Sequence, residues 1–257
     1  MIVDCFTFFD ELEILEVRLN ALAPFVDKFF LEESTVTFTG KMKRMYFDEN
    51  KSKFKDFNIV HIVSRDGMNQ DIGKYKEDAW KRECYQREFL LKRAAQDIED
   101  DEILLLSDVD EIPDLSKYNG AEGVFLHKLY YYYFNCYTGH KSWRGTVAVK
   151  KKNAGDLNTL RRRRHRMPAV GRGWHFSYLG TPERIRYKIE SFSHTVLNTD
   201  KIKNGIAQNK NNLTDLFGKE WSLRRIDTEK PFTVQTPDGP EWLLNHKDLF
   251  QDQWVNQ

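Results

Sequence analysis

Three carboxylates directly follow an apolar run near the middle of the chain. Residues 103–113 read Ile-Leu-Leu-Leu-Ser-Asp-Val-Asp-Glu-Ile-Pro, and a short apolar run that stops at a proline is typical of a buried strand. Because side chains alternate along a strand, Asp108 and Asp110 are expected to point the same way. Buried carboxylates are costly unless a cation compensates them, and hard divalent cations prefer carboxylate oxygens. The segment therefore predicts a metal or diphosphate site at the carboxyl end of a strand, where ligands collect in open α/β sheets.

Basic residues are concentrated in a second segment, 161–166, which reads Arg-Arg-Arg-Arg-His-Arg. A nuclear-import or nucleic-acid patch is one interpretation, but the net charge of +1 and the lack of an accompanying basic face argue against it. We favour a loop that contacts phosphate beside an active site, with a merely solvated loop as the alternative. Arg87, on a predicted helix, either forms an exposed ion pair or reaches the same ligand across the sheet edge.

Two further residues have chemistry that suits such a site. His175 stands in the segment Gly-Trp-His-Phe-Ser; a lone histidine is more often structural, but a cation held by two aspartates needs further ligands, and imidazole suits manganese better than calcium. Glu183 follows Thr181-Pro182 at a predicted helix start. It either complements the helix dipole as a first-turn acid or acts as a carboxylate general base.

The pattern of apolar residues predicts alternating strands and helices in the first half of the chain. A capping box, Asp10-x-x-Glu13, is expected to begin a helix that Pro24 ends. Strands are predicted over 2–7, 28–32, 58–63, 103–108, 123–134 and 143–149, helices over 77–98 and 181–193, and loops over 35–58 and 153–173. This order implies parallel strands with helical crossovers, followed by a part with an antiparallel strand at 143–149.

Composition narrows the class of protein. With 257 residues, 40% hydrophobic and 31% charged, the chain is expected to be a soluble globular protein that does not bind nucleic acid. Neither a signal peptide nor an apolar stretch of about 18 residues is apparent. Three distant cysteines without metal spacing, Cys5, Cys84 and Cys136, indicate reduced thiols in the cytosol.

Several short motifs in one order resemble glycosyltransferase family 17, the β-1,4-mannosyl-glycoprotein 4-β-N-acetylglucosaminyltransferases that add bisecting N-acetylglucosamine. The similarity runs from about residue 3 to about residue 250. Its motifs are Glu33-Ser34 with Gly40, the helix pattern Trp80, Glu83, Tyr85 and Arg87, Asp108-Val-Asp-Glu-Ile-Pro113, Leu160–Arg164 with Met167-Pro168, Gly173-Trp-His-x-Ser177, Thr181-Pro-Glu-x-Ile185, and Leu243-Leu244 with Phe250.

The resemblance implies an α/β fold of the GT-A type, with a Rossmann-like, mostly parallel sheet and a smaller antiparallel part. We expect a single catalytic domain over 1–257, with a nucleotide-sugar half at 1–113 and an acceptor half at 114–257. It also implies an inverting, metal-dependent transfer from a UDP-sugar, UDP-N-acetylglucosamine in characterised relatives, to a glycan hydroxyl. Animal members carry a membrane anchor and stem, whereas this chain begins at the first strand, so we expect a cytoplasmic enzyme of a bacterium or virus. Donor sugar, acceptor and oligomeric state stay open.

Roles for individual residues follow from these expectations. Asp110, with Asp108 and His175, is expected to hold Mn²⁺ or Mg²⁺ on the donor diphosphate, with the metal acting as a Lewis acid. The donor is also expected to contact Arg87, the 161–166 segment (Arg162 and Arg164 above all) and, at the uridine, Glu33. Glu183 is the first candidate for the base and Glu111 the second. Tyr132, Trp143 and Trp174 are candidates for stacking on acceptor sugar rings.

Two other classes of function use similar residues. A glycoside hydrolase also pairs carboxylates with aromatic platforms, but it spaces its acids about 5–10 Å apart and needs no metal. A non-catalytic module would bind a nucleotide or glycan without turnover.

Overall fold

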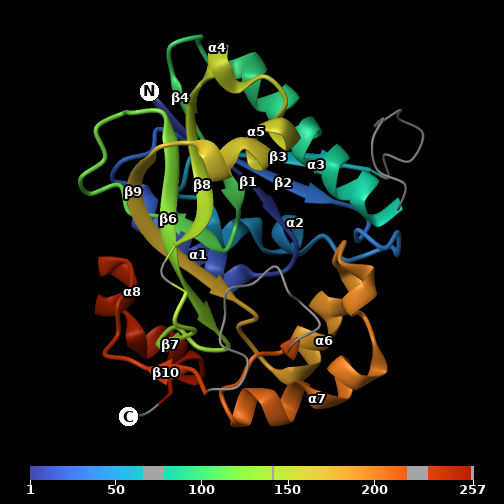
Figure 1. Cartoon of the computed structure of the whole chain (residues 1–257). Coiled ribbons are helices and arrows are strands. Elements are labelled where there is room, and N and C mark those ends of the chain that lie inside the picture. The colour runs from blue at the N-terminus through green and yellow to red at the C-terminus, as the bar shows by residue number, and fades with distance from the viewer. Residues whose placement is uncertain (66–77, 141, 219–230, 256–257) are drawn as a thin grey trace.

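The computed structural model describes residues 1–65, 78–140, 142–218 and 231–255. One large mixed sheet runs through the molecule in the strand order β10-β7-β6-β8-β4-β1-β2-β3 (Figure 1). The first four strands along the chain are β1 (Ile2–Phe8), β2 (Lys28–Ser34), β3 (Ile59–Ser64) and β4 (Ile103–Asp108). These four pair in parallel. The helices that join them are α1 (Leu12–Leu22), α2 (Tyr46–Asn50) and α3 (Asp78–Ala94).

The second half of the chain extends the sheet with antiparallel pairs. Its strands are β5 (Glu111–Pro113), β6 (Gly123–Tyr131), β7 (Cys136–Tyr137), β8 (Trp143–Lys150), β9 (Ala169–Ser177) and β10 (Thr233–Val234). As predicted for 143–149, β8 is antiparallel to its neighbours β4 and β6. The strand β9 runs parallel to β6 and pairs antiparallel with the short β5. Its helices are α4 (Lys151–Ala154), α5 (Leu157–Arg163), α6 (Pro182–Ser191), α7 (Asp200–Asn211) and α8 (Glu241–Asn245).

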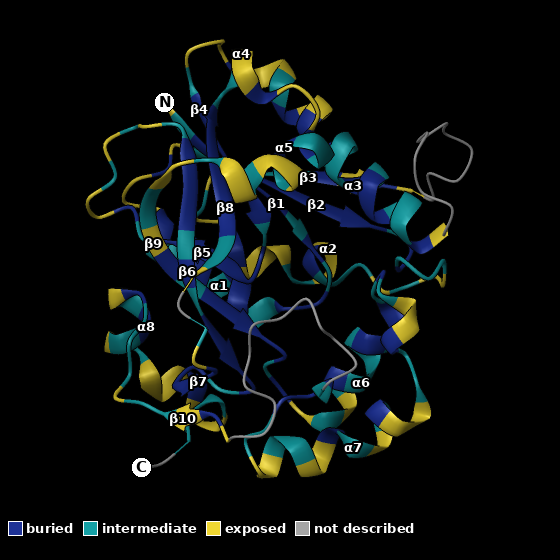
Figure 2. Cartoon of the chain, viewed as in Figure 1, coloured by how far each residue is buried: buried dark blue, intermediate teal, exposed yellow. Residues whose placement is uncertain are grey.

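The alternation of side chains along β4 fixes which elements cover each face of the sheet. Ile103 and Leu105 belong to the core on the α1 side, whereas Leu104 and Leu106 belong to the core shared with α3 and α5. The central strand β4 is accordingly buried from Ile103 to Ser107, within the dark middle of the sheet in Figure 2. A third core lies beneath α6 and α7 and contains Tyr131 and Ile189.

Two segments that the sequence predicts as loops contain regular structure. In 35–58, α2 and a 3-10 turn (Lys51–Phe54) bury Phe47 and Phe54, whose rings stack at 6.0 Å between centroids. In 153–173, Asp156 caps α5 by accepting a hydrogen bond from the Thr159 amide, and Leu157 and Leu160 are buried. Two apolar residues three positions apart are enough to give a short helix one buried face. Both loop predictions are therefore wrong.

The helix α1 starts without the predicted capping box. Its N-cap residue is Glu11, and no side chain caps the helix. The Glu11 carboxylate instead accepts hydrogen bonds from the amides of Phe9 and Asp10, which turns the chain tightly between β1 and the helix. Asp10 and Glu13 are thereby left to contact residues of α6.

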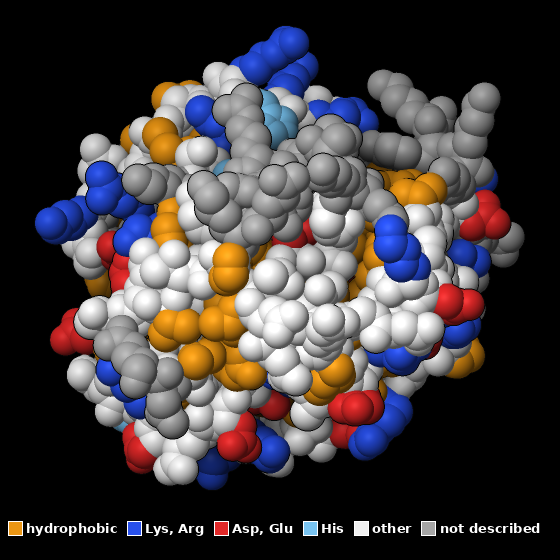
Figure 3. Space-filling model, turned by 60° about the horizontal axis from the view of Figure 1, so that its bottom comes forward, with side chains coloured by type: hydrophobic (Ala, Val, Ile, Leu, Met, Phe, Trp, Pro, Cys, Tyr) orange, Lys and Arg blue, Asp and Glu red, His pale blue; other side chains and the backbone are white. Residues whose placement is uncertain are grey.

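None of the helices in the described part of the chain is long and apolar enough to cross a bilayer. Cys5, Cys84 and Cys136 are buried, and they form no disulfide bond among the described residues. Acidic and basic side chains are interspersed over the face shown in Figure 3, in keeping with the net charge of +1.

Candidate active site

The three carboxylates after the apolar run lie at the carboxyl end of β4, in the middle of the sheet. Asp108 is the last residue of the strand and shares the face of Leu104 and Leu106, which is covered by α3 and α5. Two arginines from these helices meet its carboxylate: Arg87 Nη2 lies 3.2 Å from Oδ1 and Arg161 Nη2 lies 2.7 Å from Oδ2. The Thr7 hydroxyl donates to Oδ1 at 3.3 Å. Asp108 is therefore tied to the basic residues of α3 and α5.

Asp110 meets a different set of partners. Its Oδ1 lies 3.5 Å from Nε2 of His175 on β9, and its Oδ2 accepts a hydrogen bond from Lys188 Nζ on α6 at 3.1 Å. The strand ends at Asp108, and residues 109–110 form a turn before β5, so strand alternation does not reach Asp110. The expectation that the two aspartates share a direction is wrong for this reason. From the sequence, His175 and Asp110 were expected to lie close together only as ligands of the same metal ion.

Glu111 anchors the arginine side chains. It is fully buried, and it accepts hydrogen bonds from Trp143 Nε1 at 2.8 Å and from Arg161 Nη1 at 3.2 Å. Arg164 Nη1 lies 3.5 Å away. Burial opposes ionisation of this carboxyl, but Arg161 and Arg164 outweigh that effect and hold its pKa well below its usual range. An ionised carboxylate with both oxygens engaged is a weak proton acceptor.

A buried arginine that sequence reasoning missed holds this strand end in shape. Arg18 of α1 is fully buried and donates from Nε and Nη2 to the Asp4 carboxylate at 2.7 and 2.6 Å. Its Nη1 donates to the carbonyls of Asp108, Val109 and Glu111 at 3.2, 3.2 and 2.8 Å. The available signal was a charge at an apolar position in each of two segments, Asp4 in the first strand and Arg18 on the buried face of the following helix.

A cavity of about 260 Å³ opens beside Asp108 on the α3–α5 face. Its lining consists of Trp80, Cys84, Arg87, Asn158, Arg161, Arg162, Arg164 and His165. Burial and the neighbouring Arg161 lower the pKa of Arg164 to about 10, and Arg164 Nε has no hydrogen-bond partner among the described residues. Arg162 is exposed and donates to the Thr159 hydroxyl. The expected arginines thus surround one cavity, together with Arg161, and their mutual repulsion favours an anion there.

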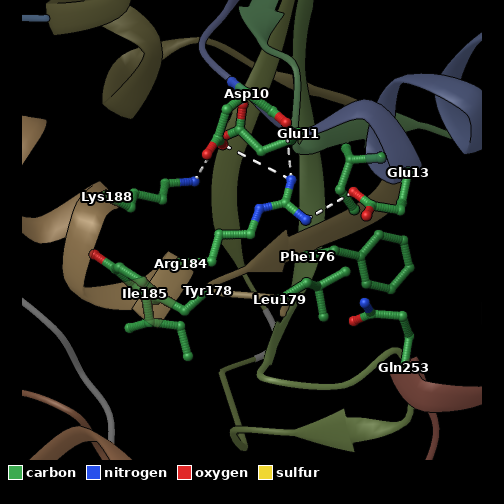
Figure 4. A pocket seen from close by; sticks show the side chains of 11 residues that line it. Asp10, Glu11, Glu13, Phe176, Tyr178, Leu179, Arg184, Ile185, Lys188 and Gln253 are labelled. Carbon is green, nitrogen blue, oxygen red and sulfur yellow. Dashed lines mark hydrogen bonds and ion pairs between the residues drawn. The ribbon is translucent and has the colours of Figure 1, made fainter. Parts of the chain in front are cut away.

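A second acidic group, also missed from sequence, lies between β1 and α6 (Figure 4). Arg184 donates from Nη1 to Glu13 at 2.7 Å, and its Nη2 approaches the Asp10 carboxylate at 3.7 Å. Lys188 Nζ donates to Glu11 Oε1 at 2.8 Å. Burial and the adjacent Glu11 raise the pKa of Asp10 to about 6. Since Lys188 also contacts Asp110, this group is continuous with the end of β4.

The proposed base and the proposed uridine contact lie in contrasting surroundings. Glu183 is fully exposed in the first turn of α6, and its own backbone amide and Thr181 lower its pKa. Lys188 lies five positions further along the helix, so the two side chains leave different faces of it. Glu33 is fully buried at the end of β2, where the amides of Phe47 and Asp48 donate to its carboxylate at 3.0 and 3.3 Å. A ligand has no exposed surface of Glu33 to contact in this arrangement.

The three aromatic residues expected to stack on the acceptor are not brought together. Trp143 lies within the acid and arginine cluster, with its ring 4.8 Å from that of His175. Trp174 alternates with His175 along β9 and donates to Asp238 at 3.2 Å on the other face. Tyr132 is fully buried, and its hydroxyl donates to the Thr214 carbonyl. The three residues therefore do not form one platform, because only Trp143 among them lies beside the three carboxylates after β4.

The described residues do not fit a ready-made metal centre. Within 1–65, 78–140, 142–218 and 231–255, no three acidic, histidine or cysteine side chains are grouped so that they could hold an ion. The donor types are suitable, but arginines occupy the oxygens of Asp108, and Lys188 and His175 occupy those of Asp110. The cations next to these carboxylates are the chain's own side chains.

Comparison with known proteins gives one family. The model described as glycosyltransferase family 17 matches residues 1–251. The β-1,4-mannosyl-glycoprotein 4-β-N-acetylglucosaminyltransferase of Homo sapiens is 25% identical over 93% of this chain, and that of Rattus norvegicus is 24% identical over 94%. In both cases the match covers 52% of the relative, so the chain spans about half the length of the curated relatives it matches.

Solved structures give a weaker likeness. The glycosyltransferase GlyE of Streptococcus pneumoniae TIGR4, in its apo form, matches 63% of this chain and 36% of its own, with 16% identity and a TM-score of 0.32.

Proposed function

Because the chain belongs to glycosyltransferase family 17, it is a glycosyltransferase, and we propose that it moves N-acetylglucosamine from a UDP-sugar to a glycan hydroxyl with inversion. The sugar follows the names of the curated relatives, and the UDP donor follows the family resemblance. The observation that carries the proposal is the arginine-lined cavity beside Asp108 at the carboxyl end of β4. The proposal also includes a fold of the GT-A type, in which residues 1–113 bind the nucleotide-sugar and residues 114–257 bind the acceptor.

The arginine cavity suits the diphosphate of the donor. Guanidinium groups present paired N–H donors that match phosphate oxygens. Arg87 and Arg161 are held by Asp108, and Arg164 by Glu111, so their planar groups are fixed before a ligand arrives. Arg164 Nε still lacks a partner among the described residues. A diphosphate would supply the missing acceptors and relieve the repulsion among the guanidinium groups.

The same arginines would assist the transfer step. As the bond between the anomeric carbon and the diphosphate breaks, negative charge grows on the departing UDP, and fixed cations nearby stabilise it. Dependence on Mn²⁺ or Mg²⁺, with Asp108, Asp110 and His175 as ligands, stays a prediction from the sequence. The side chains that compensate charge in the described arrangement are arginines and Lys188.

Replacing Arg161 with glutamine should weaken UDP binding about 10- to 100-fold. A charge-assisted hydrogen bond contributes roughly 1.5–3 kcal/mol, and each factor of ten corresponds to about 1.4 kcal/mol. Titration calorimetry with UDP measures the change. Arg163→Gln is the matched control, because Arg163 is exposed on the same helix and does not line the cavity. Equal affinities in the two variants would remove Arg161 from the donor site.

We retain Glu183 as the proposed base, with Glu111 second. Inversion needs one group that takes the acceptor hydroxyl proton while the sugar is displaced. Glu183 is accessible to an acceptor, whereas the Glu111 oxygens already bind Trp143, Arg161 and Arg164. Trp143 is the expected acceptor contact that lies beside the acids, and it supports an acceptor approach from the β8 side.

Glu183→Gln should leave UDP affinity unchanged and lower the transfer rate about 10²- to 10⁴-fold, the usual contribution of a general base. Glu241→Gln serves as the control, since Glu241 is likewise an exposed first-turn acid, on α8. Initial rates at saturating donor measure the effect. A Glu183→Gln variant that turns over at the wild-type rate would exclude this carboxylate as the base.

The function itself is tested by mass-detected transfer from UDP-, GDP- and CMP-sugars to a panel of glycans, with and without EDTA. We expect transfer from UDP-N-acetylglucosamine. A donor preference for GDP- or CMP-sugars would contradict the proposed donor, and full activity in EDTA would contradict the proposed metal. Cleavage of glycosidic bonds without a nucleotide-sugar would instead favour a glycoside hydrolase.

A further inference from the structure

The turn that ends the arginine segment 161–166 is held from the neighbouring strand β8. Arg144 of this strand donates from Nη1 to the carbonyl of Arg164 at 2.9 Å and to that of Met167 at 2.8 Å. Arg164 is the residue that caps the end of α5, and Met167 caps the end of the 3-10 turn that follows (Arg164–Arg166). The last carbonyls of a helix lack intrahelical partners, and Arg144 supplies a donor at two successive helix ends.

Among the ion-paired arginines that line the cavity, Arg164 has the longest contact with a carboxylate. Its Nη1 lies 3.5 Å from Glu111 Oε1, whereas Arg87 and Arg161 reach carboxylate oxygens at 3.2 Å or less. The Arg164 side chain is nevertheless only 14% exposed, and its guanidinium carbon lies 5.5 Å from the centre of the Trp143 ring. One long ion pair therefore does not by itself explain why this side chain is directed inward.

Arg164 is directed inward against electrostatic repulsion. Arg87 and Arg161 line the same cavity, and like charges in a partly buried site repel one another. Arginine is also a long side chain with many rotamers, so it turns toward solvent unless its surroundings hold it. Two consecutive residues of β8 do so: the Trp143 ring lies beside the guanidinium, and Arg144 fixes the backbone from which the side chain starts. Because β8 pairs with β4 on one side and β6 on the other, it is a rigid support.

We propose that Arg144 is a positioning residue of the donor site: by holding the turn 164–167 it keeps the Arg164 guanidinium directed at an anion in the cavity. Arg164 Nε, which has no hydrogen-bond partner among the described residues, can then donate to a diphosphate oxygen. Arg144 is not among the described residues that line the cavity, so it acts through Arg164. The identity of the anion rests on the proposed function, whereas the hold on the turn does not.

Limited digestion with trypsin tests the hold on the turn without any ligand. Arg144→Met should be cleaved within 161–167 at least about fivefold faster than the wild type, because a released segment opens more often and cleavage follows the open population. Arg186→Met is the matched control, since Arg186 of α6 also donates to a backbone carbonyl, that of Lys203 at 3.0 Å, and it should leave cleavage within 161–167 unchanged. Mass spectrometry of the fragments assigns the cut sites. Equal cleavage rates in Arg144→Met and the wild type would overturn the proposal.

A double-mutant cycle tests whether the hold acts through Arg164. Calorimetry with UDP and with inorganic pyrophosphate should show about three- to tenfold weaker binding in Arg144→Met, a part of the loss expected for Arg164→Gln. Arg144→Lys should recover most of the affinity, since both hydrogen bonds come from one nitrogen that an ammonium group can replace. In the Arg164→Gln background, Arg144→Met should weaken binding by less than about twofold further. An equal loss in both backgrounds would overturn the proposal, because Arg144 would then act independently of Arg164.

Arg144→Gln covers the case in which Arg144→Met does not fold. Glutamine keeps a polar end but is too short to reach both carbonyls, so faster cleavage and weaker binding are again expected, and wild-type behaviour would overturn the proposal. The measurements also separate this inference from the proposed function. A wild type that binds neither UDP nor pyrophosphate would contradict the donor site, whereas unchanged trypsin cleavage in the Arg144 variants would contradict the role of Arg144.

Discussion

Replacing Arg18 with alanine is expected to lower the free energy of unfolding by about 3–5 kcal/mol, the usual cost of removing one partner from a buried ion pair. Arg18 and Asp4 are both fully buried, and the guanidinium also caps three carbonyls at the end of β4. The change would leave Asp4 charged and unpaired, together with carbonyls that have lost their donor. Chemical denaturation followed by circular dichroism measures the loss.

Two comparisons isolate the effect of this pair. Arg93→Ala on α3 should change the stability by less than about 0.5 kcal/mol, as exposed substitutions do, because Arg93 is exposed and donates only to Gln96 among the contacts described. In the double variant Asp4→Asn with Arg18→Met, part of the loss should return, since no charge is left unpaired. A stability of Arg18→Ala within 1 kcal/mol of the wild type would show that the pair is not needed for the fold.

Replacing Asp110 with alanine is expected to lower the rate of sugar transfer by about 10²- to 10³-fold, the range for loss of one preorganised electrostatic contact in an active site. Asp110 holds His175 and Lys188 in their present positions, and the sequence predicts it as a metal ligand. Its removal should therefore misplace two side chains at once. Transfer from UDP-N-acetylglucosamine under saturating conditions measures the change.

The control for Asp110→Ala is the substitution of Asp114, four residues further along the chain. Asp114 caps the following turn by accepting a hydrogen bond from the Ser116 amide at 3.0 Å, so Asp114→Ala should keep its transfer rate within about threefold of the wild type. Circular dichroism must show both variants folded. If Asp110→Ala transfers sugar at the wild-type rate, the carboxylates after β4 are not part of the active site.

Much of the site can be read from the sequence because its elements are local. The apolar run at 103–106 predicts β4, and its alternation places Asp108 on the face of Leu104 and Leu106. The arginine run, interpreted as a phosphate-contacting segment, does surround a cavity beside Asp108. Family membership also follows from short motifs in one order, which the match over residues 1–251 confirms.

Other features depend on contacts between distant segments, which no local pattern encodes. The turn after Asp108 sends Asp110 toward β9 and α6, although strand alternation predicts the opposite. Tyr132 belongs to an aromatic run that suits a sugar platform, yet it is buried beneath α7 and contacts Thr214. In both cases the decisive partner is more than 60 residues away in the chain.

The sequence by itself therefore determined the four parallel strands, the long helices α1, α3 and α6, the family and the presence of acids at the carboxyl end of β4. Only the tertiary structure decided which cation each acid meets: Arg18 for Asp4, Arg87 and Arg161 for Asp108, and Lys188 for both Glu11 and Asp110. The physical reason is that hydrophobic periodicity is a property of neighbouring residues. The pairing of buried charges depends instead on which faces the folded chain brings together.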